Sequence, residues 1–299
     1  MNTKTILFHF LAIMTVAVWG VTFVSTKILI TGGLSPQAIF FYRFLMAYVV
    51  MLAICHRRIF SASLRDEALL CLAGMCGGSV YFVAENTALG LTMASNVSLL
   101  ICMAPVFTLI LSRVFNGTRM KAHVAGGSSI ALAGVAFVVF AGAASVDVRP
   151  AGDMLTLVAA MVWAAYCMLV RNLGERYPSM FITRKVFFYG VVTVLVYFLF
   201  RPVEIDLGLL SQPKIYGNLL FLGILASLVC YLTWNVVIKN LGATTAANYI
   251  YLIPLVTFTA SAYFLSERLT AMTLAGAACI IGGVYIAERG LPHHLPRRR

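Results

Sequence analysis

Two stretches of the sequence, ASNVSLLICMAPVFTLILSRVF at residues 94–115 and ATTAANYIYLIPLVTFTASAYF at residues 243–264, are copies of one apolar pattern. A shift of 149 residues places 86–135 on 235–284 without gaps, and about a dozen positions then coincide. The coinciding pairs include Asn86/Asn235, Ala94/Ala243, Pro105/Pro254, Thr108/Thr257, Ser112/Ser261, Phe115/Phe264, Arg119/Arg268, Gly127/Gly276 and Gly134/Gly283. Earlier in the chain, VWG at 18–20 matches VWA at 162–164, with Thr22 opposite Tyr166. The chain is therefore expected to contain two related halves.

The composition requires lipid as the main solvent. Of 299 residues, 61% are hydrophobic and 11% are charged, and the mean hydropathy is +0.94. A water-soluble domain carries about 25% charged residues. Because a spanning helix uses about 20 apolar residues, ten spans leave only short loops and no room for a soluble catalytic domain.

Apolar runs between Gly, Pro and charged clusters predict ten spans, five in each half. Their approximate ranges are 6–30, 35–55, 68–89, 93–115, 123–143, 153–171, 181–200, 214–238, 243–265 and 271–288. Since five is an odd number, the two copies must lie upside down to one another in the bilayer, as in many secondary transporters. The predicted fold is an all-α membrane protein of ten transmembrane helices in two inverted five-helix repeats. The repeats occupy residues 1–146 and 147–290, and a basic cytoplasmic tail follows at 291–299.

The basic residues of the loops predict the orientation. With ten spans both termini lie on one side, and that side carries 16 Lys and Arg against 5 on the other, with Arg43 inside a span. Positive residues favour the cytoplasmic side. We therefore expect a multi-pass protein of the bacterial cytoplasmic (inner) membrane with both termini in the cytoplasm.

Several other classes of function fit the sequence poorly. The net charge of +12 is spread between the spans and forms no groove-like cluster, so nucleic acid is not an expected partner. The seven cysteines form no C-x-x-C pair and the five histidines are peripheral, so neither a metal site nor a disulfide framework is expected. No Walker loop, H-E-x-x-H or G-x-S-x-G is present. We expect no cofactor, no direct use of ATP and no enzyme activity.

Short motifs along nearly the whole chain resemble one known family. Trp19-Gly20-Val21-Thr22-Phe23 resembles a W-G-x-x-F signature, and Pro36 through Arg43-Phe44 resembles a P-x-x-x-x-x-x-R-F motif. The run at 243–254, followed by Ser266-Glu267-Arg268, is similar to the second repeat of the same family. These motifs are those of the drug/metabolite transporter superfamily, in its EamA-type ten-helix branch. The resemblance implies export of a small metabolite, commonly an amino acid or a related compound, although Thr118 stands in the first repeat where the second has Glu267.

Two ionisable residues inside spans are the first candidates for function, because such groups are costly in a bilayer. Arg43 follows Pro36 by seven residues and Glu85 precedes Gly90 by five. At the helical rise, both lie about 7–10 Å below the external surface. They are predicted to form a buried ion pair, which either fastens two helices or binds a substrate or a proton. Lys27 is shallower and is expected to reach the interface.

Amide and aromatic side chains of the repeat core form the second group of candidates. Amides could bind a zwitterion and aromatic rings could supply a flat wall, although amides also join helices and aromatics also mark interfaces. The full set of substrate-binding or coupling candidates is Trp19, Arg43, Tyr81, Glu85, Asn86, Asn96, Trp163, Tyr166, Trp234, Asn235, Asn248 and Tyr249, with Tyr251 a further aromatic. We expect a central cavity lined mainly by spans 1, 3, 4, 6, 8 and 9, with the Gly-rich spans 5 and 10 as peripheral packing supports.

The function predicted from these observations is a secondary active transporter that works by alternating access. Its partners are a small-molecule substrate, a proton as a second candidate ligand, and the lipid bilayer. Two alternatives stay open, a facilitative channel-like protein or a lipid-precursor flippase, and a membrane enzyme fits less well. The sequence does not fix the substrate, the coupling ion or the oligomeric state, and a monomer is compatible with it.

Overall fold

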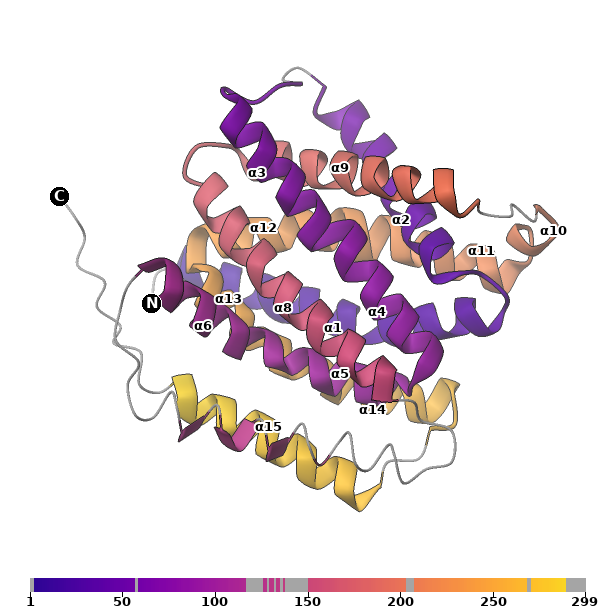
Figure 1. Ribbon diagram of the computed structural model, residues 1–299, viewed down its shortest axis with the longest axis vertical. Coiled ribbons are helices and arrows are strands. Elements are labelled where there is room, and N and C mark those ends of the chain that lie inside the picture. Colours follow the sequence, from indigo (N-terminus) through magenta and orange to yellow (C-terminus); the bar gives the residue numbers. More distant parts are fainter. Residues whose placement is uncertain are drawn as a thin grey trace.

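The computed structural model describes residues 3–56, 59–116, isolated positions between 126 and 137, 150–202, 207–267 and 270–288. Within these residues the regular elements are all helices (Figure 1), as the all-α prediction requires. Seven helical segments of the described chain are long and apolar enough to cross a bilayer. These are Thr5–Thr31, Pro36–Ile54, Leu64–Leu91, Ala94–Phe115, Pro150–Leu173, Ser179–Phe200 and Pro213–Leu241. The chain is a multi-pass membrane protein.

The first half contributes four of the predicted spans to the described structure. They are α1 (Thr3–Thr31); α2 (Pro36–Ile54); α3 (Leu64–Gly74), η1 (Met75–Ser79) and α4 (Val80–Leu91) in one run; and α5 (Ala94–Leu100), η2 (Ile101–Met103) and α6 (Ala104–Asn116) in another. The predicted fifth span, 123–143, lies outside the described residues except at isolated positions. The tail at 291–299, Thr118, Arg119 and Arg268 also lie outside them.

The second half follows the same order. It comprises α8 (Pro150–Leu173); α9 (Ser179–Phe200); the short α10 (Leu207–Leu210); α11 (Pro213–Leu220), η3 (Phe221–Val229) and α12 (Cys230–Leu241); α13 (Ala243–Ala247), η4 (Asn248–Leu252) and α14 (Ile253–Phe264); and α15 (Ala271–Glu288). These helices correspond to predicted spans 6 to 10. Their ends differ from the predicted ones by a few residues.

Local sequence explains where several helices begin and end. Ser35 precedes α2, and its hydroxyl accepts a hydrogen bond of 3.2 Å from the N–H of Ala38, while Pro36 occupies the first turn. Ser63 caps α3 in the same way, at 3.1 Å from the N–H of Asp66. Such caps satisfy N–H groups that the helix itself leaves free. Gly242, with φ of +91°, ends α12.

Irregular helical turns occur at equivalent places in the two halves. The π-helical segment η1, shifted by 149 residues, falls at 224–228, inside the π-helical segment η3. The 3₁₀ segment η2 falls in the same way at 250–252, inside η4. Pro105 and Pro254 are each the second residue after η2 and η4, and a proline removes one backbone hydrogen bond and clashes with the preceding turn. In both halves a 3₁₀ turn thus comes just before the proline.

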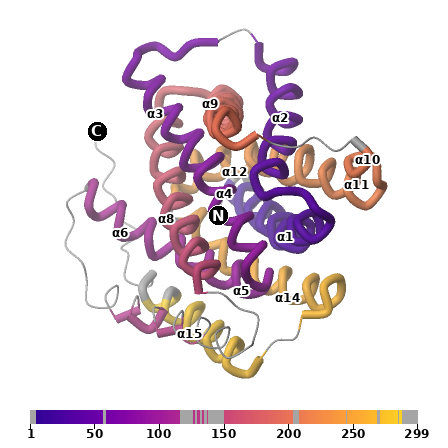
Figure 2. Tube along the Cα trace, turned by 45° about the vertical axis from the view of Figure 1, so that its right-hand side comes forward, coloured from indigo at the N-terminus to yellow at the C-terminus, as the bar shows by residue number. Residues whose placement is uncertain are grey.

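The first helix, α1, lies inside the bundle, and α15 lies at its edge (Figures 1 and 2). α1 packs against α4, α12 and α14, whereas α15 packs against α5, η2 and α6. Glycines allow α15 to pack closely against the described residues of the predicted fifth span. A Cβ on Gly283 would lie 2.6 Å from the carbonyl oxygen of Gly127, and one on Gly134 would lie 2.7 Å from that of Gly276. The predicted role of these glycines in close packing is confirmed at these positions.

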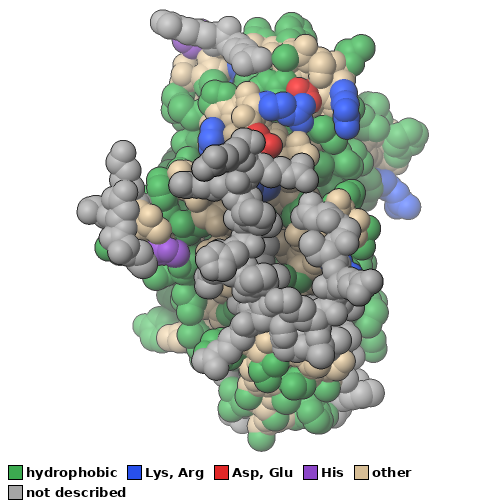
Figure 3. Space-filling view, turned by 90° about the vertical axis from the view of Figure 1, so that its left-hand side faces the viewer, with side chains coloured by type: hydrophobic (Ala, Val, Ile, Leu, Met, Phe, Trp, Pro, Cys, Tyr) green, Lys and Arg blue, Asp and Glu red, His purple; other side chains and the backbone are tan. Residues whose placement is uncertain are grey.

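Charged side chains gather at one end of the molecule, which we call the charged end and define by Asp66, Glu67, Arg176 and Lys185. Arg176 pairs with Asp66, and Lys185 pairs with Glu67. Figure 3 shows Lys, Arg, Asp and Glu side chains close together near the top of this face, next to hydrophobic side chains. The two pairs join the start of α3 to α9 and to the turn before α9.

The opposite ends of several helices meet at the turn that joins α4 to α5. Lys27 of α1 donates hydrogen bonds to the carbonyl oxygens of Leu89 and Thr92, at 2.5 and 2.9 Å. Glu267 accepts hydrogen bonds from the N–H groups of Ala94 and Ser95, at 2.8 and 3.1 Å. A cation at the end of one helix and an anion at the start of the next both oppose the helix dipoles favourably. We call Lys27, Glu267 and residues 89–95 the turn junction.

Candidate functional site

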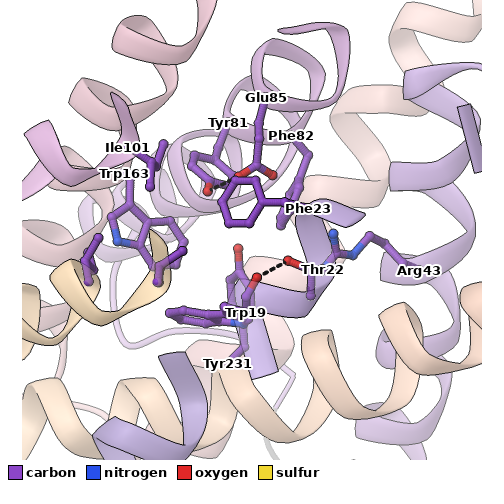
Figure 4. Close-up of a pocket in the computed structure, with 12 residues that line it drawn as sticks. Trp19, Thr22, Phe23, Arg43, Tyr81, Phe82, Glu85, Ile101, Trp163 and Tyr231 are labelled. Atoms are coloured by element: carbon purple, nitrogen blue, oxygen red, sulfur yellow. Dashed lines mark hydrogen bonds between the residues drawn. The ribbon is translucent and has the colours of Figure 1, made fainter. Parts of the chain in front are cut away.

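A cavity lies in the middle of the bundle, where helices of both halves meet. The space between its side chains amounts to about 420 Å³, part of which is open to the outside of the molecule. Figure 4 shows the side chains that line it. They are Trp19, Thr22 and Phe23 of α1, Arg43 of α2, Tyr81, Phe82 and Glu85 of α4, Ile101 of η2, Trp163 of α8, Tyr231 of α12, Ile250 of η4 and Ile253 of α14.

The lining agrees with the predicted cavity. Spans 1, 3, 4, 6, 8 and 9 all contribute, and α2 adds one residue, Arg43. None of the lining residues comes from α15, the predicted tenth span. Five predicted site residues therefore meet in one place, namely Trp19, Arg43, Tyr81, Glu85 and Trp163. That they bind a substrate stays a prediction.

Two tryptophans from equivalent positions of the two repeats face each other across the cavity. The rings of Trp19 and Trp163 are edge to face, with centroids 5.3 Å apart and planes at 88°. Such a geometry is favourable for aromatic pairs. Trp234 lies behind Trp19, with its centroid 5.0 Å away, and is fully buried. The indole N–H of Trp19 donates to the carbonyl oxygen of Ala226 at 3.0 Å.

The π-helical segments supply the backbone acceptors that hold these rings. Ala226 belongs to η3, and the hydroxyl of Tyr231 donates to the carbonyl oxygen of Gly77 in η1, at 2.6 Å. A π turn replaces the usual i→i−4 hydrogen bonds and so leaves carbonyls available for side chains. Gly77 also makes room for an aromatic ring, because a Cβ there would lie 2.3 Å from a ring carbon of Tyr166.

The guanidinium of Arg43 is buried and is oriented by two contacts. Its Nε donates to the hydroxyl of Ser227 at 2.9 Å, and its Cζ lies 4.2 Å from the centre of the Phe82 ring. The side chain is 2% exposed. The planar guanidinium can stack on a ring in this way, and its two terminal nitrogens, which have no hydrogen-bond partner among the described residues, could bind a carboxylate in a fork.

The carboxylate of Glu85 is held on the same helix that carries Phe82. The hydroxyl of Tyr81, one turn earlier, donates to Glu85 Oε1 at 2.5 Å. Residues at i and i+4 lie on one face of a helix, so both side chains point into the cavity (Figure 4). In the described part of the chain, the hydrogen bond from Tyr81 is the one that the Glu85 side chain accepts. The other carboxylate oxygen, Oε2, therefore has no partner there.

The predicted ion pair between Arg43 and Glu85 does not form. The ion pairs of the described chain are those of the charged end. Arg43 is held by the hydroxyl of Ser227 in η3 and by the ring of Phe82, whereas Glu85 is held by Tyr81. The depth estimate placed both groups at the cavity correctly, but it carried no information on the direction in which each side chain points. An acid and a base thus face the same cavity without neutralising each other directly.

The amides lie outside the cavity lining, and two of them join helices. Asn86 donates to the carbonyl oxygen of Pro36 at 2.9 Å. Asn235 donates to Thr183 at 2.8 Å and accepts from the hydroxyl of Tyr166 at 2.6 Å. Asn96 is buried, and Asn248 is half-buried with its Oδ1 unpartnered in the described chain. The alternative prediction was that the amides join helices. Asn86 and Asn235 do so.

The remaining aromatic candidates support the cavity wall from behind or lie elsewhere. Tyr166 is fully buried and packs against the ring of Trp163, with centroids 4.9 Å apart. Tyr249 is half-buried and forms a hydrogen bond with His9 near the start of α1. Tyr251 is half-buried as well.

Sequence reasoning missed five polar or aromatic residues of the site, and four of them carried a usable signal. Phe23 closes the W-G-x-x-F motif, and Thr22 was matched with Tyr166 in the repeat comparison. Phe82 and Tyr231 occupy equivalent positions under the shift of 149 residues. Ser227 carried no signal, because its contact with Arg43 depends on the π turn of η3.

Comparisons with known proteins give one consistent family. The sequence profile of the EamA-like transporter family matches residues 6–140 and 150–288. A relative from Archaeoglobus fulgidus, described as an uncharacterized transporter, is 29% identical over 96% of this chain and 98% of its own length. A probable terminal-alkyne amino-acid exporter from Streptantibioticus cattleyicolor is 29% identical over 79% of this chain and 76% of its own.

Two further similarities extend over almost the whole chain. A probable amino-acid metabolite efflux pump from Salmonella typhimurium is 26% identical over 93% of both chains. A protein of known crystal structure superimposes with a TM-score of 0.66 over 94% of this chain and 97% of its own, at 17% identity. At that identity the superposition establishes the shared fold alone.

Proposed function

Since the chain belongs to the EamA-like transporter family, we propose that it is a secondary transporter that exports a small zwitterionic metabolite, such as an amino acid, by alternating access. The observation that carries this proposal is the cavity itself. It places a guanidinium and a carboxylate, each with hydrogen-bonding atoms to spare, in one space walled by aromatic rings.

The proposed architecture is that of ten spans in two inverted repeats, at 1–146 and 147–290. Three features support it: the profile matches each half separately, the π and 3₁₀ turns recur at a shift of 149 residues, and Trp19 meets its counterpart Trp163 across the cavity. Ligand sites between inverted repeats near the bilayer midplane are the common arrangement in secondary transporters. We place the protein in a bacterial inner membrane with both termini, and therefore the charged end, in the cytoplasm.

The class of substrate is inferred from the charged side chains of Arg43 and Glu85 in the cavity. A substrate carboxylate would bind the free nitrogens of Arg43, and a substrate ammonium would bind Glu85 Oε2. Its apolar part would pack against the wall that the rings of Trp19, Trp163 and Tyr231 form where they contact one another. The names of the exporter from Streptantibioticus and of the efflux pump from Salmonella agree with an amino acid or a related compound.

Glu85 is also the proposed coupling residue. It is 6% exposed and faces Arg43, Tyr81 and Tyr231 at the cavity. A carboxylate in such a place can exchange a proton for an ammonium, since each neutralises the same charge. The transporter would then exchange protons for substrate.

Purified protein in liposomes tests the proposal. The vesicles are offered a panel that holds the side chain constant and varies the charges: an apolar amino acid, its amide, and its N-acetyl derivative. We expect transport of the zwitterion, with at least about tenfold weaker competition by either derivative, because each loses a charge-assisted hydrogen bond. Equal competition by all three would refute the zwitterion site. Movement of a lipid precursor without any of them would favour a flippase.

A further inference from the structure

A second acid, Asp153, is buried at the end of the bundle opposite the charged end. It lies in the first turn of α8, and its exposed fraction is 0%. The turn before it fits tightly against the first repeat. A Cβ on the neighbouring Gly152 would lie 3.1 Å from Leu91 and 3.2 Å from Thr92. The close approach places the Asp153 carboxyl beneath the turn junction and away from solvent.

Within the described part of the chain, neither oxygen of this carboxyl has a hydrogen-bond partner. The hydroxyl of Thr92 lies near enough to interact with it but outside hydrogen-bonding geometry, and this hydroxyl has no partner among the described residues. A buried carboxylate without donors or a counter-ion is strongly disfavoured, because its desolvation is not compensated. The neutral acid is the form that this environment tolerates.

The described charged groups near Asp153 form hydrogen bonds with other partners. Lys27 donates to the carbonyl oxygens of Leu89 and Thr92, and Glu267 accepts from the backbone of α5. Neither forms an ion pair with Asp153 in the described chain. Glu85 lies seven residues before Thr92, about 10 Å further along α4 at the helical rise. No described cation is therefore placed to hold Asp153 as an anion.

We propose that Asp153 is a proton-binding site, distinct from the substrate cavity, that is protonated while the turn junction is closed and ionises when the junction opens. Opening would admit water to the carboxyl and so stabilise its charge. The bound proton thereby favours the closed arrangement of this end, and rising pH favours the open one. The proposal deepens the alternating-access function proposed above, since it assigns a proton-dependent step to the external side.

The first test is infrared spectroscopy of the purified protein across neutral and alkaline pH. We expect a band from a protonated, non-hydrogen-bonded carboxyl that Asp153→Asn removes. Glu85→Gln is the matched control, because it removes the buried acid of the cavity and should leave the band of Asp153 in place. A band that persists undiminished in Asp153→Asn, or no such band in the wild type, overturns the proposal.

The second test follows the opening of the turn junction itself. Ser95 is 1% exposed and its N–H binds Glu267, so a cysteine introduced as Ser95→Cys becomes reactive only when the junction opens. A membrane-impermeant maleimide is applied to right-side-out vesicles, and the protein without this substitution gives the background. We expect labelling to rise with pH, by at most about tenfold per pH unit for one linked proton. With Asp153→Asn added, labelling should stay slow at every pH.

The same pH dependence with and without Asp153→Asn would overturn the proposal. Neither test contains a substrate or measures transport. If the proposed substrate is wrong, both results can still hold, and if Asp153 is not a proton site, the transport panel above is unaffected. The failures of the two proposals are therefore distinguishable.

Discussion

The substitution Glu85→Gln tests the cavity most directly. Glutamine has nearly the same shape, and its side-chain carbonyl can still accept the hydrogen bond from Tyr81. The change therefore removes one negative charge from a site that is 6% exposed, while the packing around it is kept. A hydrogen bond to a charged group contributes about 1.5–3 kcal/mol. Its loss should weaken the apparent affinity for a zwitterion by about 10- to 100-fold.

The assay is uptake into proteoliposomes of a labelled apolar amino acid, measured over a range of substrate concentrations and pH. The apparent substrate affinity of the wild type should depend on pH, and that of Glu85→Gln should not, because the group proposed to exchange a proton for the substrate ammonium is gone; a pH dependence of the maximal rate that comes from Asp153 would remain in both. Glu175→Gln, at an exposed turn before α9, is the matched control and should behave as wild type. Equal affinity and an equal pH profile in Glu85→Gln would refute the reasoning and leave Glu85 as a structural residue.

Three other predictions follow from the packing and the orientation. Arg43→Lys keeps the positive charge but loses the fork and the stacking on Phe82, so substrate affinity measured by competition should fall by about 1.5–3 kcal/mol; unchanged affinity would exclude a bidentate contact. Gly77→Ala drives a methyl group into the Tyr166 ring and should cost about 1–3 kcal/mol of stability in thermal unfolding, whereas Gly217→Ala, which meets no atom within 4 Å, should not destabilise. Alkaline phosphatase fused to the C-terminus should be inactive, and an active fusion would reverse the proposed orientation.

The sequence was sufficient for the features that depend on residue counts along the chain. Apolar length located the helices, and depth, obtained from residue number and helical rise, correctly brought Arg43 and Glu85 to one cavity. The direction of a side chain around its helix was not accessible in the same way. A π turn adds a residue to a turn and so rotates every later side chain to another face. The contact between Arg43 and Ser227, which follows such a turn in η3, could therefore not be predicted.

The amides illustrate a second limit of the sequence. Asn86 and Asn235 recur at equivalent positions, which is compatible both with a binding role and with a structural one. In the fold each bonds a neighbouring helix, at Pro36 and at Thr183. An amide buried in a bilayer protein needs a partner wherever it points, so its presence in a span does not by itself indicate a substrate.

The tryptophans of the cavity give the protein an optical signal of its own. The chain contains three, and Trp19, Trp163 and Trp234 are all within 6.4 Å of one another, centroid to centroid, at or behind the cavity wall. Because the sequence has no further tryptophan, the whole tryptophan emission comes from these three rings. Intensity and wavelength of the intrinsic fluorescence should therefore report on this one place, so that ligand entry and the arrival of water can be followed in unlabelled protein without any added dye.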